Sequence, residues 1–185
     1  VQYFDDDSFA VIHDIFPRKT LLKRKSSGKK IDFQLIAANI DTAFIVQSLD
    51  NNFNLRRLER YLTMITESMI EPVILLSKMD LMNTDELESK VDEIKKIMPK
   101  ILLTPFSNEN DNGISEIKDL LETAKTYCLL GSSGVGKTTL LNKLLGENIL
   151  ETKEVREKDS KGKHTTTRRQ LLKLENGALI IDTPG

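Results

Sequence analysis

GSSGVGKTT, residues 131–139, is the stretch of sequence that decides the fold. It matches the pattern G-x-x-x-x-G-K-[ST], in which small residues allow successive backbone N–H groups to point at a phosphate. Lys137 is predicted to neutralise β- and γ-phosphate oxygens, which also makes it a catalytic candidate, and the Thr138 hydroxyl is predicted to bind magnesium. The residues expected to contact the nucleotide along this loop are Gly131, Ser132, Ser133, Gly134, Val135, Gly136, Lys137, Thr138 and Thr139.

The segments on both sides of this loop support the prediction. An apolar strand over 126–130 precedes it, and a helix over 137–145 follows it, with Gly146 placed as a C-cap. Such a helix presents the positive end of its dipole to the phosphates. A chance glycine-rich turn is the alternative, and it accounts neither for the flanking elements nor for the Lys-Thr pair.

Two stretches downstream of the loop are predicted to complete a magnesium site. DTPG, residues 182–185, follows the apolar strand 179–181, and an aspartate there, Asp182, can reach the metal through water. Thr165 or Thr166, at the end of the polar segment 147–164, is expected to supply a further ligand. A run of threonines at a sheet edge is the alternative interpretation. His164 either orients water and senses phosphate or is a solvated loop histidine, and the sequence leaves both open.

Two stretches upstream of the loop are predicted to bind a guanine base. Asp80 follows the apolar run PVILL (72–76), and its carboxylate can accept hydrogen bonds from N1–H and N2–H₂ of guanine, whereas adenine carries an acceptor at N1. The Lys78 stem is expected to lie over the base, and Ser77 stands where GTPases commonly have Asn or Thr. Ser107 and Asn108 follow the strand 101–104 and are expected to place a backbone N–H on guanine O6. An ordinary surface loop leading into a helix is the alternative for the stretch 77–80.

The rest of the chain alternates strands with helices, which predicts a doubly wound α/β domain. Apolar residues at helical spacing run from Leu55 to Met69, with Asn52 or Asn54 as the N-cap. A capping box at Asn83 and Glu86 starts another helix, which ends near 98–99. The remaining elements expected are a strand over 9–15, a strand over 41–48, a helix over 113–125, and an antiparallel hairpin turning at 175–177.

Composition restricts the class of protein. The chain has 185 residues, of which 39% are hydrophobic and 30% charged, so it holds one globular domain and a fragment of another. With a net charge of -1, the chain as a whole is not expected to bind polyanions. The single cysteine, Cys128, excludes an internal disulfide, which is typical of a protein in the reducing cytoplasm. Cys128 itself is expected to be a small buried strand residue. No apolar run predicts a membrane span, and both ends read as cuts through a longer protein.

The order of the motifs is unusual, because the guanine-binding stretches come before the phosphate loop rather than after it. With this order, the chain resembles the circularly permuted GTPases of the ribosome-small-subunit-dependent GTPase A family (RsgA/YjeQ). The resemblance rests on GSSGVGKTT (131–139), GKHTTT (162–167), DTPG (182–185) and AANIDTAFIV (37–46), and also on FPRKTLLKRK (16–25) and NLRRLERYL (54–62).

This resemblance implies an α/β P-loop NTPase fold. Residues 33–185 would form a circularly permuted Ras-like G domain, truncated after DTPG, and residues 1–32 would be part of an OB-fold β segment. It also implies GTP and GDP with Mg²⁺ as ligands, and zinc only in a C-terminal domain that is absent from these residues. His164 maps to the switch histidine that is the family's catalytic candidate.

The resemblance further implies a monomeric cytoplasmic GTPase that acts late in maturation of the small ribosomal subunit and is stimulated by it. The expected partners are that subunit and its rRNA, with no membrane contact, and the basic run 18–30 is expected to bind RNA phosphates unless it is a solvated turn. Two rival functions stay open: a P-loop ATPase, which the Lys78–Asp80 pattern disfavours, and a GTP-binding switch with negligible turnover.

Overall fold

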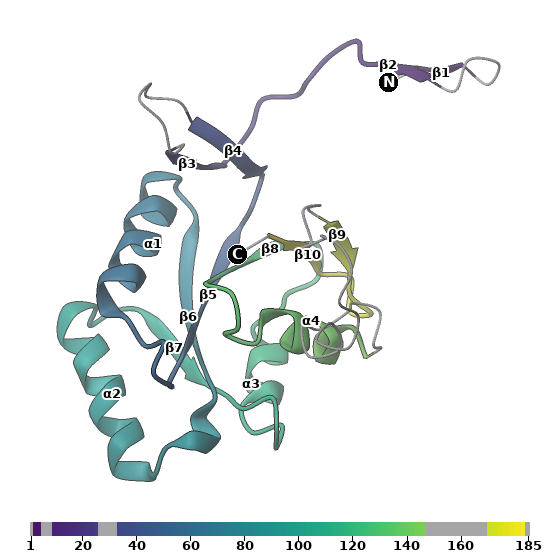
Figure 1. Cartoon of the computed structure of the whole chain (residues 1–185). Helices are drawn as coiled ribbons and strands as arrows, with labels where there is room; N and C mark the ends of the chain where they lie inside the picture. Colours follow the sequence, from purple (N-terminus) through teal and green to yellow (C-terminus); the bar gives the residue numbers. More distant parts are fainter. Residues whose placement is uncertain (1, 5–8, 26–32, 147–169, 184–185) are drawn as a thin grey trace, which may run out of the picture.

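The computed structural model describes residues 2–4, 9–25, 33–146 and 170–183 (Figure 1). Within them, a six-stranded sheet has the order β7-β6-β5-β8-β10-β9. Its strands are β5 (Thr42–Ser48), β6 (Glu71–Ser77), β7 (Leu102–Pro105), β8 (Thr126–Leu130), β9 (Gln170–Lys173) and β10 (Leu179–Asp182). Neighbouring strands run parallel except β9, which pairs antiparallel with β10 at one edge, so the predicted hairpin and edge strand are confirmed.

Helices cover both faces of this sheet, as a doubly wound fold requires. The helices α1 (Leu55–Glu67) and α2 (Thr84–Ile97) lie on one face, and α3 (Ile114–Asp119) and α4 (Lys137–Leu145) lie on the other (Figure 1). A single 3₁₀ turn, η1 (Met79–Leu81), follows β6. The predicted α/β class and the strand–helix alternation from Thr42 onward are therefore confirmed.

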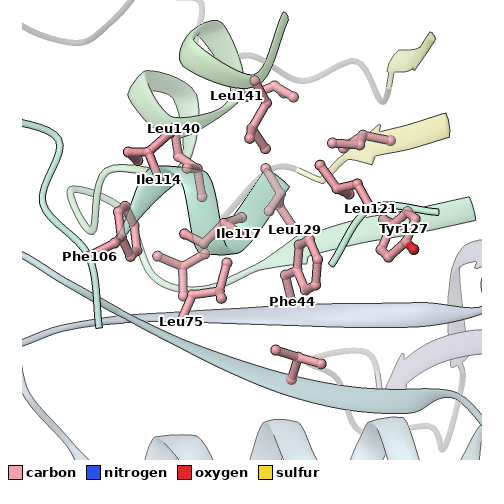
Figure 2. Packing of buried hydrophobic residues seen from close by; sticks show 14 of the residues in the cluster. Phe44, Leu75, Phe106, Ile114, Ile117, Leu121, Tyr127, Leu129, Leu140 and Leu141 are labelled. Atoms are coloured by element: carbon pink, nitrogen blue, oxygen red, sulfur yellow. The ribbon is translucent and has the colours of Figure 1, made fainter. Parts of the chain in front are cut away.

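The central strands are apolar on both faces because each face packs against helices. Along β5, Ala43 and Ile45 belong to the core under α1 and α2, whereas Phe44 and Val46 belong to the core under α3 and α4. Figure 2 shows the second core, in which the Phe44 and Tyr127 rings lie 5.1 Å apart between their centroids. Each fully buried side chain of this kind stabilises the fold by about 1.5–3 kcal/mol, which holds the strand ends and their loops in place.

Local capping signals act as predicted. Asn54, rather than Asn52, caps α1, since its side chain accepts a hydrogen bond from the Arg57 amide. Asn83 and Glu86 form a reciprocal capping box at α2. Gly146 ends α4 in the left-handed conformation (φ +76°), which glycine adopts without steric strain.

The predicted helix over 113–125 is wrong at its C-terminal end, because α3 stops at Asp119. Tyr127 lies in β8, and its hydroxyl donates to the Leu120 carbonyl (2.8 Å) and accepts from the Glu122 amide (2.8 Å). These bonds fix a turn where the sequence suggested helix. Ala124, at φ +63°, then directs the chain into β8.

Two other elements are shorter than predicted. Met69 lies beyond α1, at φ +56° and 79% exposed, because the helix ends in a Schellman motif. The Met69 amide donates to the Thr66 carbonyl and the Ile70 amide to the Ile65 carbonyl. The strand predicted over 9–15 is limited to β2 (Phe9–Val11), since β1 (Gln2–Phe4) supplies partners for these three residues alone.

The N-terminal part also contains a hairpin of β3 (Leu21–Lys25) and β4 (Phe33–Ala38). The domain boundary predicted at 32/33 falls inside this hairpin, and the division of the chain stays a prediction. Leu22 is fully buried in the same core as α1, so the hairpin packs on the α1 side of the sheet. Among the described residues, no helix is both long and apolar enough to cross a membrane.

Candidate nucleotide-binding site

The predicted site residues that the structure describes lie at one edge of the sheet. Parallel strands end at the same edge: β5, β6, β7 and β8 each lead into a loop there, and β10 ends there at Asp182. The loop after β8 is the predicted phosphate loop, and the loops after β6 and β7 carry the predicted guanine-binding residues. In open α/β sheets this edge is where ligands bind.

The phosphate loop needs glycine at positions 131 and 136. Gly131 has φ +154°, and a Cβ there would lie 2.4 Å from the Val46 carbonyl oxygen. Gly136, the N-cap of α4, has φ +91°, and a Cβ would lie 2.5 Å from Asn108 Nδ2. These approaches press the loop against β5 and against the loop after β7, so its course is set by its neighbours.

Lys137 is buried in the first turn of α4. Its Nζ donates to the carbonyl oxygens of Gly131 (2.7 Å) and Ser132 (2.8 Å), so the ammonium lies inside the curve of the loop. Asp182, at the end of β10, is buried beside it. Burial raises the pKa of Asp182, while the Lys137 charge lowers it in part. A cation and a carboxylate thus lie together at the phosphate end of the site.

Serine side chains join the loops that follow neighbouring strands. Ser77 is fully buried, and its Oγ donates to the Val135 carbonyl at 2.7 Å, which ties the end of β6 to the phosphate loop. Ser107 Oγ donates to an Asp80 carboxylate oxygen and accepts from the Glu109 amide. The hydroxyl at position 77 therefore braces the loop although GTPases commonly have Asn or Thr there.

Asn108 takes part in the same bracing, since its Nδ2 donates to the Gly136 carbonyl at 3.2 Å. Asp80 itself is exposed, which leaves its carboxylate accessible to a ligand from solvent. The structure thus brings Ser77, Asp80, Ser107 and Asn108 together beside the phosphate loop, and their binding of guanine stays a prediction.

Sequence reasoning missed the contribution of Asp50, in the loop between β5 and α1. Lys78 adopts φ +63°, and its Nζ pairs with Asp50 Oδ2 at 2.7 Å. Burial raises the pKa of Asp50, but hydrogen bonds from Lys78, Ser48 and the Asn52 amide outweigh it and lower the pKa to about 2. The carboxylate is therefore ionised and holds the lysine that is predicted to cover the base.

Sequence reasoning also missed a contact between the first turn of α1 and the phosphate loop. Asn52 Nδ2 and Arg57 Nη1 both donate to Ser132 Oγ, at 3.1 and 2.5 Å. The sequence predicts only a possible helix-capping role for Asn52. The available signal was its position in the loop that follows β5, at the sheet edge where the phosphate loop also lies.

Some predicted residues fall outside the description. His164, Thr165, Thr166, Pro184 and Gly185 are not among the described residues, so their roles stay predictions. Thr183, the last described residue, donates through Oγ1 to the Leu129 carbonyl, which fixes the end of β10 against β8. Thr138 lies in the first turn of α4, next to Lys137.

A family model described as RsgA GTPase matches residues 15–185. The chain belongs to the RsgA GTPase family. The resemblance seen in its motifs is thereby confirmed. The chain is 46% identical over 179 residues to small ribosomal subunit biogenesis GTPase RsgA 2 of Lactiplantibacillus plantarum, covering 97% of the chain and 50% of that protein. It is 45% identical over 175 residues to the RsgA protein of Methanosarcina acetivorans, covering 95% of the chain and 47% of that protein.

Solved structures agree with this membership. The YjeQ structure from Thermotoga maritima matches with a TM-score of 0.69 and 28% identity, over 98% of the chain and 57% of YjeQ. YloQ, described as a circularly permuted GTPase, matches in fold with a TM-score of 0.58 and 20% identity, over 94% of the chain and 58% of YloQ. The chain has the permuted GTPase fold, with β5, β6 and β7 placed before the phosphate loop. It spans about half the length of the RsgA relatives it matches.

Proposed function

We propose that this chain binds guanine nucleotide and hydrolyses GTP within a factor that acts in late maturation of the small ribosomal subunit. The observation that carries the proposal is the Ser77–Val135 hydrogen bond, because it joins the guanine-specifying loop to the phosphate loop within a single site. The names of the RsgA relatives support the biological setting, since they are called small ribosomal subunit biogenesis GTPases.

Asp80 selects guanine in this proposal. Its Oδ1 accepts the Ser107 hydroxyl, and a carboxylate has lone pairs enough to accept two base donors as well. Adenine would place an acceptor against these oxygens and leave an unfavourable contact. Lys78, held by Asp50, covers the base. We assign the Asn108 backbone amide as the donor to guanine O6, because the Ser107 amide already donates to the Asn112 carbonyl at 2.9 Å.

The residues at the phosphate end suit Mg²⁺. Thr138 offers a hydroxyl and Asp182 a buried carboxylate, and Mg²⁺ prefers one or two such oxygen ligands together with water and phosphate oxygens. When bound, the ion would neutralise charge on the β- and γ-phosphates. We assign Thr165 or Thr166 as a further ligand and His164 as the catalytic side chain, and we place zinc only in the family's C-terminal domain.

The proposal extends to RNA contact by the basic strand β3. Lys23 and Arg24 are exposed, and Lys23 Nζ lies 4.8 Å from the centre of the Phe33 ring. Neutralising Lys23, Arg24 and Lys25 should flatten the salt dependence of binding to the small subunit, because fewer counterions are released. An unchanged slope would refute the RNA contact. A partial OB-fold over 1–32, a monomeric state and cytoplasmic residence belong to the same proposal.

Two measurements on the intact protein test the function. In the first, GTP, GDP and ATP compete for the site, and we expect both guanine nucleotides to displace a labelled guanine nucleotide while ATP does not. Equal displacement by ATP would instead indicate a P-loop ATPase. In the second, GTP hydrolysis is followed with and without small ribosomal subunits. Turnover that stays negligible in both conditions would indicate a binding switch and not an enzyme.

A further inference from the structure

Arg57 reaches the phosphate loop from α1, on the opposite face of the sheet from α4. Its Nη1 and Nη2 donate to Asn52 Oδ1 at 2.9 and 3.0 Å, and Nη1 also donates to Ser132 Oγ at 2.5 Å. The planar guanidinium matches this arrangement because its donors have a fixed fork geometry. The Arg57 amide caps α1 through Asn54, so replacing the side chain leaves the helix cap intact.

Ser132 connects Arg57 to the phosphate-binding lysine. Its side-chain oxygen accepts from Arg57 and from Asn52 Nδ2, while its backbone carbonyl accepts Lys137 Nζ at 2.8 Å. One residue is thus held by α1 through its hydroxyl and holds Lys137 through its carbonyl. A shift of Ser132 would displace the ammonium that is to meet the phosphates.

Arg57 is set for this contact and not for an ion pair. Its hydrogen-bond acceptors are neutral oxygens of Asn52 and Ser132, and within the described part of the chain no carboxylate lies within 4.0 Å of it. The Asn52 carbonyl also accepts from Gln47, which is buried at the end of β5. The guanidinium is therefore anchored to the sheet through Asn52 and contacts the phosphate loop through Ser132.

We propose that Arg57 is a positioning residue that sets the phosphate loop in its nucleotide-binding geometry before the nucleotide arrives, and this rests on the proposed guanine-nucleotide binding. It acts through Ser132 and touches no phosphate. A loop ordered in advance loses less conformational freedom on binding, which strengthens affinity. The diphosphate and the triphosphate benefit equally, because both meet the same loop.

The test measures the affinity and dissociation rate of fluorescent GDP and of a non-hydrolysable GTP analogue with the intact protein. Arg57→Ala should weaken both nucleotides by about tenfold, equivalent to about 1.4 kcal/mol. Arg57→Lys should remain close to Arg57→Ala, since a single ammonium lacks the planar fork. The exposed neighbour Arg56 is the matched control, and Arg56→Ala should bind as the wild type does.

A double-mutant cycle separates positioning from a general loss of structure. Ser132→Ala should weaken binding about as much as Arg57→Ala, and the double variant should be no weaker than the worse single one, because both break the same connection. Additive losses, wild-type affinity in Arg57→Ala, or full rescue by lysine would overturn the inference. If Arg57→Ala does not fold, the nucleotide affinity of Ser132→Ala alone decides. Wild-type affinity in Ser132→Ala would then refute the inference. Failure of the wild type to bind either nucleotide would instead refute the proposed function.

Discussion

Replacing Ser77 by alanine should weaken the joint between the two halves of the nucleotide site. The Ser77 hydroxyl donates to the Val135 carbonyl at 2.7 Å, and both residues are fully buried. Alanine removes the donor and leaves a carbonyl without that partner in a region closed to water. Such an unsatisfied group costs about 1–3 kcal/mol, which is larger than the net value of an ordinary hydrogen bond because no solvent replaces the lost donor.

This cost predicts two measurable effects. In urea, without nucleotide, the free energy of unfolding should fall by about 1–3 kcal/mol, and Tm should fall by about 2–4 °C for each kcal/mol in a chain of this length. GDP should also dissociate faster, because the phosphate loop is no longer tied to the loop that carries Asp80. Release of a fluorescent GDP, followed by rapid mixing, measures this second effect.

The control is Ser115→Ala, at an exposed serine of α3 whose hydroxyl donates to the carboxylate of the adjacent Glu116. Its stability should stay within about 0.5 kcal/mol of the wild type. If Ser77→Ala unfolds and releases GDP as the wild type does, the reasoning fails. If stability falls but GDP release does not change, Ser77 contributes to the core and does not couple the loops.

Three further predictions concern single residues. Asp80→Asn should weaken GTP binding by roughly 10- to 100-fold and allow xanthine nucleotide to bind, because the C2 oxygen of xanthine accepts from the new amide. Competition binding with guanine and xanthine nucleotides tests this, and an unchanged guanine preference would exclude Asp80 from the base site. Gly131→Ala should destabilise the protein by more than about 1 kcal/mol, because its Cβ would lie 2.4 Å from the Val46 carbonyl oxygen. Gly134→Ala should cost less: its φ of +80° strains an alanine, but no atom of the described residues lies within 4 Å of the added Cβ. Equal losses on urea unfolding would contradict the steric argument. Cys128 is fully buried, and burial raises the pKa of its thiol to about 12. At pH 8 the thiol should therefore be alkylated only when the protein unfolds, at the rate of unfolding. Rapid labelling of the native protein would contradict this prediction.

The elements that sequence predicted well are those with local signals. The apolar run of β6 needs only its own residues to be identified, because a parallel strand buried on both faces has no polar side. The Asn83–Glu86 box is likewise complete within four positions. The phosphate loop combines a local glycine pattern with a strand before it and a helix after it, so its place in the fold follows directly.

The features that sequence missed depend on residues far apart in the chain. The end of α3 is set by the Tyr127 hydroxyl, which arrives from β8, and no helix propensity carries that information. Asp50 and Arg57 belong to no local motif that assigns them to the site, and they matter because β5 lies between β6 and β8. Their partners, Lys78 and Ser132, belong to two loops that only the sheet order brings together.

The position of β8 between β5 and β10 has a consequence for biosynthesis. Translation delivers β5, β6 and β7 early, and these strands can pair with one another and pack against α1 and α2. The other face of β5, with Phe44 and Val46, is covered only when β8, α3 and α4 have emerged. The end of α4, Leu145, follows Ser48 by roughly 100 residues, so at the usual elongation rate a nascent chain exposes this apolar face for about 5–20 s. With the motifs in this order, the strands that lead into the predicted guanine-binding loops are synthesised before β8 and α4, which form the phosphate end of the site.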